Sequence, residues 1–393
     1  MRFTTKIFPS RKSNLGILEL NNPKALHALS LDMIHCMNDV WDQWSALPAD
    51  KGLRGILLKA TKNSKRPSFC SGGDVKTVWE EGSGGGDGHG KGVPGLLTAD
   101  FFRDEYSLNY KMSVNDRIPQ VSLWDGIVMG GGVGISIHGK YRVATEQTLF
   151  AMPEMAIGLF CDVGSMWWMP RILKGGLAPY VALTGARLKA QDLIYTGIAT
   201  HYVPSDNLEA LEVALAEATE NENGQIPYND VVAPVLDNFN EWPAADSPHG
   251  FLQQHHGIID KIFQEDSVES IVSNLESFQD DTFCKATLET LSRQSPTSLK
   301  VTLEGLRRGA EFSSIGEALQ MEYRMAQAFM QPGSDFYRGI RSVLVEKSKD
   351  PVRWDPQNLH GVRNEMVNSY FASLGDHEWQ VPTPEDETNS SKL

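Results

Sequence analysis

Residues 129–134, MGGGVG, constrain the fold more than any other stretch of the chain. Three consecutive glycines follow a strand-like segment, so no side chain separates the backbone from whatever approaches it. A helix that opens there would bring its positive N-terminal end to the same place. A second glycine-rich bend, residues 69–74 (FCSGGD), also follows a strand-like segment. Two such bends can aim one N–H each at a single carbonyl oxygen, which outlines an oxyanion hole.

Two acidic side chains, Glu154 and Asp162, follow the longer glycine run in the segment MPEMAIGLFCD. Pro153 restricts the backbone just before Glu154. Two acids that lie close together have pKa values pushed apart, so that one can serve as an acid and the other as a base. The alternative is that both acids cap helices or pair with arginines. With an exposed backbone N–H, the acid pair indicates acyl chemistry.

Strand-like and helix-like segments alternate in the first half of the chain. Residues 2–8 and 15–20 flank the polar segment 11–14 and predict a hairpin. Ser30 is a suitable N-cap for an amphipathic helix whose Met and Trp residues face the core. Residues 55–59 form an apolar run typical of a strand covered on both faces, and the alternation predicts parallel pairing.

From about residue 206 the pattern is helical throughout. The predicted helices cover residues 208–218, 257–264, 267–275, 281–292, 298–308, 315–330 and 335–345, with prolines such as Pro234 as breakers. A chain of 393 residues exceeds the size at which one core keeps growing. We therefore expect a core over residues 1–205, a helical lobe over 206–380 and a flexible tail over 381–393.

Composition excludes several classes of function. The formal net charge of -14 argues against nucleic-acid binding as the main activity. The sequence contains no run of 18 apolar residues, so we expect no membrane segment. The four cysteines lie far apart without a CxxC pair, so we expect neither a disulfide framework nor a metal site. The glycine-rich insertion at 82–92 predicts a mobile loop, and its role is left open.

The last three residues, 391–393, read SKL. This tripeptide is a receptor-read peroxisomal address when the tail is free. It predicts a location in the matrix of the peroxisome or a related microbody, with the peroxisomal import receptor as a partner.

The order of these motifs resembles the crotonase (enoyl-CoA hydratase/isomerase) superfamily. More closely, residues 119–171 are similar to the 3-hydroxyisobutyryl-CoA hydrolase family, and the similarity extends over roughly residues 1–375. The resemblance implies an α/β fold, a crotonase-like spiral of ββα units followed by a helical C-terminal lobe.

The resemblance also implies roles for the glycine bends. The N–H groups of Gly73 and Gly131 would hold the oxygen of a thioester. Coenzyme A would lie near two loops and be bound by residues of both. These CoA-binding residues are Lys24, Ala25, Leu26, Ser71 and Gly72. Coenzyme A is then part of the substrate, and no separate cofactor is expected.

Within the superfamily the acids decide the reaction. Hydratases carry a second glutamate at the position of Gly134, whereas the hydrolase pattern places an acid eight residues after the first, where this chain has Asp162. The resemblance implies that Glu154, Asp162, Glu105 and Gly131 contact the substrate. Helical spacing alone favours a solvent-facing Glu105.

Two positions depart from the family pattern. His27 stands where the family usually has asparagine, which can alter how the coenzyme loop is held. Ser165 and Met166 replace glycines, which predicts added bulk at the wall of the acyl pocket.

The expected function is hydrolysis of a short-chain 3-hydroxyacyl-CoA thioester, most plausibly 3-hydroxyisobutyryl-CoA from valine breakdown. Glu154 would either attack the carbonyl to form a mixed anhydride or activate a water, with Asp162 positioning it and binding the 3-hydroxyl. The alternatives are a hydratase or isomerase that uses Glu154 alone, and a non-catalytic subunit of a larger assembly. Assembly into a homo-oligomer is left open.

Overall fold

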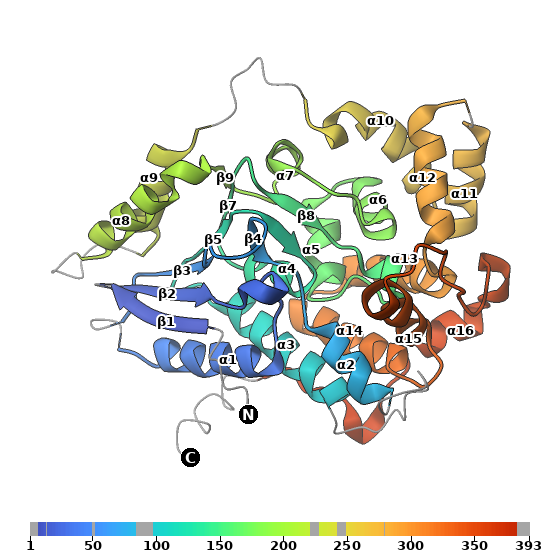
Figure 1. Cartoon of the computed structure of the whole chain (residues 1–393), viewed down its shortest axis with the longest axis horizontal. Coiled ribbons are helices and arrows are strands. Elements are labelled where there is room, and N and C mark those ends of the chain that lie inside the picture. Colours follow the sequence, from blue (N-terminus) through green and yellow to red (C-terminus); the bar gives the residue numbers. More distant parts are fainter. Residues whose placement is uncertain are drawn as a thin grey trace.

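Two sheets form the centre of the molecule (Figure 1). The structure is a computed structural model that describes residues 7–12, 14–48, 52–83, 97–220, 228–241, 249–278 and 280–382. The larger sheet has the strand order β1-β2-β3-β5-β7-β9 and the smaller one β4-β6-β8. The strands are β1 (Ile7–Lys12), β2 (Leu15–Leu20), β3 (Gly55–Ala60), β4 (Ser68–Cys70), β5 (Gln120–Trp124), β6 (Ile127–Met129), β7 (Tyr141–Ala144), β8 (Leu149–Ala151) and β9 (His201–Tyr202).

The predicted hairpin is present, but its turn is shorter than predicted. Strand β1 continues through Arg11 and Lys12, which pair with Gly16 and Leu15 of β2. Antiparallel pairing satisfies backbone groups that a longer turn would leave to solvent, and this outweighs the polar side chains of the segment. Residues 2–6 of the predicted first strand lie outside the described residues.

The chain alternates between the two sheets. Strands β3, β5 and β7 of the larger sheet are each followed by a strand of the smaller sheet and then by a helix, namely α2 (Val75–Gly82), α4 (Gly131–Ile137) and the 3-10 helix η2 (Glu154–Ile157). This repeat confirms the predicted ββα units. Because β4, β6 and β8 are parallel, their carboxyl ends meet at one edge. The segments that follow them are therefore brought together.

Helices cover both faces of the larger sheet. Alternate residues of β3 point to opposite faces, with Ile56 and Leu58 in the main core and Leu57 in a second cluster. That second cluster lies under α8 (Leu208–Thr219) and α9 (Tyr228–Phe239), which Figure 1 shows on one side of the sheet. On the other face lies α1 (Leu31–Ser45), whose Met33, Met37 and Trp41 are buried as predicted, whereas Trp44 is only partly buried.

The second half of the chain is helical, as predicted, and it packs onto the first half. The remaining helices are α3 (Leu97–Val114), α5 (Ser165–Ile172), α6 (Leu177–Thr184), α7 (Ala190–Thr196), α10 (Phe251–Phe263), α11 (Val268–Ser277), α12 (Thr282–Arg293), α13 (Pro296–Glu311), α14 (Ile315–Phe329), α15 (Asp335–Ile340) and α16 (Asn364–Ser369), with a π-helix over Arg341–Glu346 and short 3-10 turns at Pro23–Ala25, Ser205–Asn207, Leu359–Gly361 and Gly375–His377. Pro234 lies inside α9 and does not end a helix there, contrary to the prediction. The division at residue 205 stays a prediction, and the tail from 383 lies outside the described residues.

Among the described helices, none has the length and apolar character needed to cross a bilayer.

Candidate active site

The two glycine bends lie side by side at the carboxyl edge of the smaller sheet. A Cβ placed on Gly131 would lie 3.1 Å from the amide nitrogen of Gly73 and closer still to Oε1 of Glu105. Gly130 precedes α4 with a φ of 47°, a left-handed value that glycine tolerates best. The sequence folds this way because only glycines let the two backbones approach so closely.

Within the described residues, the N–H groups of Gly73 and Gly131 have no acceptor, so both can bind an oxygen between them. Gly73 forms a parallel bridge with Leu29, in which Leu29 N–H donates to the carbonyl of Gly72 and Asp74 N–H donates to the carbonyl of Leu29. The N–H of Gly73 itself therefore points away from Leu29. Gly131 is the first residue of α4, and the first N–H groups of a helix have no acceptor within it.

Three acidic side chains converge on a cavity beside these glycines. The cavity has a volume of about 80 Å³ and is lined by Gly73, Gly131, Glu105, Glu154 and Asp162, together with Ser71 and Gly72. Apolar side chains complete its walls: Val75, Phe101, Phe102, Ile157 and Leu159. Glu105 is 2% exposed, and Glu154 and Asp162 are each 5% exposed. The structure thus brings together every residue predicted to be catalytic.

The solvent-facing interpretation of Glu105 is wrong. Its helix, α3, contacts α1, α2, α4 and α14, so it is covered on more than one face. A helix surrounded in this way buries residues outside its apolar stripe, which spacing along one helix cannot reveal. Asn109, one turn after Glu105, is buried for the same reason.

Burial makes all three acids hard to ionise. It raises the pKa of Asp162 to about 7, although the hydrogen bond from Tyr106 opposes the rise. Burial, with the negative charge of Asp162, raises the pKa of Glu154 well above its usual range. The pKa of Glu105 is also raised well above its usual range, first by burial and then by the charges of Asp162 and Glu154.

Tyr106 holds Asp162 in place, a role that the sequence pattern did not suggest. Its hydroxyl donates a hydrogen bond of 3.0 Å to Oδ2 of Asp162, and both groups are buried. In the sequence Tyr106 is one more aromatic residue on an apolar helix face, with no local signal of a polar partner.

Replacing Tyr106 by phenylalanine is expected to raise the pKa of Asp162, because the lost hydrogen bond stabilises the ionised carboxylate. If activity requires that carboxylate, the acid limb of the kcat/KM profile shifts to higher pH. The shift is measured by initial rates across the neutral range. Tyr110→Phe, on the same helix with its ring against Gly316 of α14, is the matched control and should not move the profile. An unshifted limb in Tyr106→Phe would contradict the assignment.

Glu322 of α14 supports the segment after Asp162 from the other half of the chain. Its carboxylate accepts hydrogen bonds from the N–H of Gly164 at 2.7 Å and of Met166 at 2.9 Å. These amides begin α5, and Glu322 is fully buried. A carboxylate at a helix N-terminus is stabilised by the helix dipole. Because Glu322 lies 160 residues downstream of the acid it supports, sequence spacing could not identify it.

Replacing Glu322 by alanine is expected to lower the free energy of unfolding by at least about 2 kcal/mol, because two buried amides lose their acceptor. Denaturant unfolding measures the loss. Glu311→Ala removes an exposed acid at the end of α13 and should cost less. Equal losses in the two variants would contradict a structural role for Glu322.

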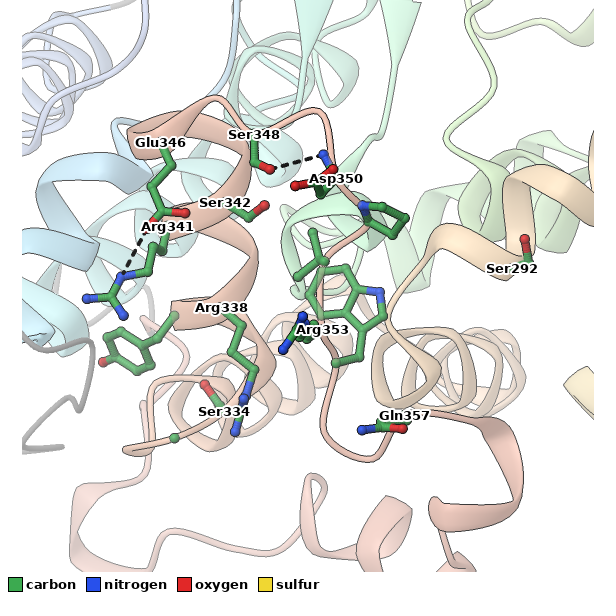
Figure 2. A pocket seen from close by; sticks show the side chains of 15 residues that line it. Ser292, Ser334, Arg338, Arg341, Ser342, Glu346, Ser348, Asp350, Arg353 and Gln357 are labelled. Atoms are coloured by element: carbon green, nitrogen blue, oxygen red, sulfur yellow. Dashed lines mark hydrogen bonds and ion pairs between the residues drawn. The ribbon is translucent and has the colours of Figure 1, made fainter.

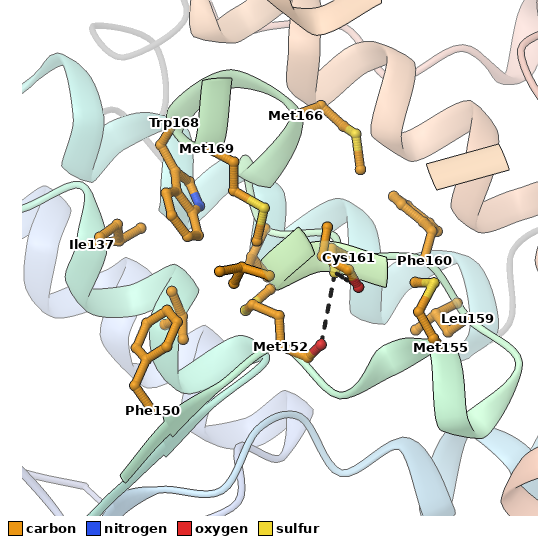
Figure 3. Packing of buried hydrophobic residues seen from close by; sticks show 14 of the residues in the cluster. Ile137, Phe150, Met152, Met155, Leu159, Phe160, Cys161, Met166, Trp168 and Met169 are labelled. Atoms are coloured by element: carbon orange, nitrogen blue, oxygen red, sulfur yellow. Dashed lines mark hydrogen bonds between the residues drawn. The ribbon is translucent and has the colours of Figure 1, made fainter. Parts of the chain in front are cut away.

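Buried apolar residues pack around the segment of chain that carries Glu154 and Asp162; Figure 3 shows these apolar residues. Met152, Met155, Phe160 and Cys161 are buried on either side of Glu154 and Asp162. The thiol of Cys161 donates to the carbonyl of Met152. The backbone that carries both acids is therefore fixed by the core.

The two loops predicted to hold coenzyme A are joined by hydrogen bonds. Ser71 N–H donates to the carbonyl of Leu26, and the Ser71 hydroxyl donates to the carbonyl of Ala25. Lys24 is exposed on the adjoining 3-10 turn. Ser71 and Gly72 line the cavity, Ala25 and Leu26 are bonded to Ser71, and Lys24 is next to them in the chain. A role in binding coenzyme A stays a prediction.

His27 supports the first of these loops from inside. It is fully buried, has a φ of 60°, and its Nδ1 accepts from the N–H of Asn22 at 3.0 Å. Burial lowers its pKa, so the neutral ring that can accept this bond is favoured.

The space beside Gly134 is occupied. A Cβ on Gly134 would lie 2.6 Å from Cβ of Val163 and 3.1 Å from Oδ1 of Asn109. Val163 has a φ of 56°, a conformation that strains a β-branched residue and occurs here next to Asp162. A longer side chain at position 134 would displace the segment that carries Asp162.

The bulk predicted at the pocket wall is not there. Met166 packs against Gly305 and Gly309 of α13, and the Ser165 hydroxyl donates to the carbonyl of Cys161. Neither side chain lines the cavity. The first turn of α5 directs both of them into the core between helices.

A much larger hollow, of about 1030 Å³, lies apart from the acid-lined cavity (Figure 2). Figure 2 shows arginines around it, but Arg341 lies 3.8 Å from Glu346 and Arg338 lies 3.2 Å from Asp355. It shares no lining residue with the acid-lined cavity. In the described part of the chain, no group of three or more His, Cys, Asp or Glu side chains is arranged to hold a metal.

Comparison with known proteins gives concordant matches. A family model described as enoyl-CoA hydratase/isomerase matches residues 15–371. The mitochondrial 3-hydroxyisobutyryl-CoA hydrolase of Xenopus tropicalis is 42% identical over 93% of this chain and 88% of its own. That of Danio rerio is 41% identical over 93% of this chain and 89% of its own. The crystal structure of a carnitinyl-CoA dehydratase from Mycobacterium thermoresistibile matches with a TM-score of 0.82 and 31% identity, covering 96% of this chain and 99% of that one.

These matches overturn the peroxisomal prediction. Both hydrolases are named mitochondrial, so the predicted location in the peroxisomal matrix is wrong, and the import receptor as a partner has no support. A tripeptide is an address only if a receptor reads it, and three residues carry little information by themselves. Residues 391–393 lie outside the described part of the chain.

Proposed function

The chain belongs to the enoyl-CoA hydratase/isomerase family, and we propose that it hydrolyses 3-hydroxyisobutyryl-CoA to 3-hydroxyisobutyrate and coenzyme A, a step of valine breakdown. The main support is that the hydrolase pair Glu154 and Asp162 faces one buried cavity beside Gly73 and Gly131. The hydrolases at about 40% identity carry this activity in their names. Their names also favour a mitochondrial location.

The proposed mechanism divides the work between backbone and side chains. The N–H groups of Gly73 and Gly131 hold the thioester oxygen and stabilise the negative charge that develops on it. By one route, the Glu154 carboxylate attacks the carbonyl carbon and the coenzyme A thiolate leaves. Water then hydrolyses the mixed anhydride. By the other route, Glu154 takes a proton from a water whose oxygen attacks and expels the thiolate. Asp162 positions Glu154 and accepts from the 3-hydroxyl.

A hydratase is the rival activity, because the similar solved structure is named a dehydratase. Water addition across a double bond uses two carboxyl groups, and the family places the second at the position of Gly134. Val163 and Asn109 occupy the space that such a side chain would need. This crowding favours hydrolysis.

Release of thiol from purified protein tests the proposal. We expect 3-hydroxyisobutyryl-CoA to be hydrolysed faster than crotonyl-CoA is hydrated. Faster hydration would instead assign a hydratase. If the protein turns over neither substrate, both proposed activities are excluded.

A further inference from the structure

Glu105 is a buried acid with an unpartnered oxygen at the centre of the site. Its Oε1 has no hydrogen-bond partner among the described residues, although Glu105 is only 2% exposed. Such an atom costs free energy unless a ligand or water satisfies it. The groups around Oε1 indicate which part of a substrate could bind it.

Oε1 of Glu105 lies against the point that the two glycine amides share. The place where a Cβ of Gly131 would stand is 3.1 Å from the nitrogen of Gly73, and Oε1 of Glu105 is nearer to it than that. Gly131 and its N–H, the N–H of Gly73 and Oε1 of Glu105 therefore border the same small space. A substrate oxygen that accepts from both amides would lie beside the Glu105 carboxyl group.

Burial and the neighbouring charges favour the protonated form of the Glu105 carboxyl group. Glu154 and Asp162 line the same cavity, and both act to keep Glu105 protonated. Other titratable groups that interact electrostatically with these acids are Tyr106 on the same helix, the thiols of Cys70 and Cys161, and Glu322 of α14. An ionised Glu105 would add a further negative charge against a carbonyl oxygen that itself becomes negative. A protonated Glu105 would instead offer that oxygen a third donor.

We propose that Glu105 holds a proton and donates it in a hydrogen bond to the carbonyl oxygen of the bound acyl group, as a third donor beside Gly73 and Gly131. The proton stays on Glu105, so no bond is made or broken there. This inference rests on the proposed function, in which that oxygen belongs to the thioester.

The test compares Glu105→Gln with Glu105→Ala. Glutamine is neutral, has nearly the same shape and keeps an N–H donor, so kcat should stay within about 10-fold of the wild type. Alanine removes the donor and should lower kcat on the order of 10²–10³-fold. Equal losses in both variants would show that an ionised carboxylate is required, and full activity in both would show that no donor acts there. Either result overturns the proposal.

The pH profile gives a second readout, which a purely structural role would not change. If activity depends on a protonated Glu105, it declines in the wild type as the pH rises through the pKa of Glu105. Glutamine cannot ionise, so the variant should not show this decline. The alkaline limb of the kcat profile should therefore shift to higher pH or disappear in Glu105→Gln. An unchanged alkaline limb would contradict the proposal. Circular dichroism and thermal unfolding establish that both variants are folded.

Failure of the proposed function would be visible in the wild type, before any variant is compared. If the wild type hydrates crotonyl-CoA instead, kcat of Glu105→Gln is compared with kcat of Glu105→Ala in the hydration reaction, because that reaction polarises the same carbonyl. If it turns over neither substrate, the ranking is measured as affinity for a ketone analogue in which CH2 replaces the thioester sulfur. Glutamine should bind it more tightly than alanine, and equal affinities would overturn the inference.

Discussion

Replacing Glu154 by glutamine is expected to lower kcat for thiol release by on the order of 10²–10⁴-fold. The amide neither attacks a carbonyl nor accepts a proton from water, so both proposed routes are blocked. The substitution keeps the size of the side chain in a tightly packed segment. A thiol assay with saturating 3-hydroxyisobutyryl-CoA measures the effect.

The same substitution should not destabilise the protein, which separates lost chemistry from lost folding. Burial raises the pKa of Glu154, so the folded protein holds a proton that the unfolded chain releases once the pH exceeds its own lower pKa. The wild type therefore loses free energy of unfolding as the pH rises above that value. Glutamine has no proton to lose, so the variant should be at least as stable as the wild type at alkaline pH. Thermal unfolding across pH measures this.

Glu289→Gln is the control for this experiment, because Glu289 is exposed and forms an ion pair with Arg293 of its own helix. Its rate should equal that of the wild type. Should Glu154→Gln keep its rate within about 10-fold, the assignment of Glu154 as the oxygen donor or base would be wrong.

Replacing Gly131 by alanine is expected to reduce kcat by on the order of 10²–10³-fold, the effect of losing one oxyanion donor. The new methyl group would project into the space between the two amides and crowd the thioester oxygen proposed to bind there. It would also clash with Oε1 of Glu105 and lie 3.1 Å from the nitrogen of Gly73. The loss should fall on kcat more than on KM, because the amides bind the developing charge more strongly than the substrate.

Gly257→Ala is the matched control. Gly257 lies within α10, and apart from its own turn of helix no described residue has an atom within 4 Å of an added Cβ. Alanine favours a helix over glycine by roughly 0.5–1 kcal/mol, so this variant should be fully active and slightly more stable. A Gly131→Ala enzyme with the rate of this control would show that the amide of Gly131 does not hold the reacting oxygen.

Much of the site was predictable because its parts follow strands in a fixed order. Gly73, Gly131 and Glu154 each come shortly after a strand of the smaller sheet, and parallel strands bring their carboxyl ends together. The local signals, glycines at bends and a proline before Glu154, are strong because they restrict the backbone directly. The same local rules failed at Pro234, where the surrounding packing retains a helix that a proline normally ends.

The sequence by itself determined the ββα order, the two glycine bends and the acid pair, because each depends on the conformational preferences of neighbouring residues. Only the tertiary structure decided that Glu105 faces the cavity, that Tyr106 binds Asp162 and that Glu322 holds the start of α5. Those three facts depend on which helices cover α3 and on where α14 returns to the core. Helical periodicity describes one helix at a time, whereas the burial of a polar group depends on all the elements packed around it.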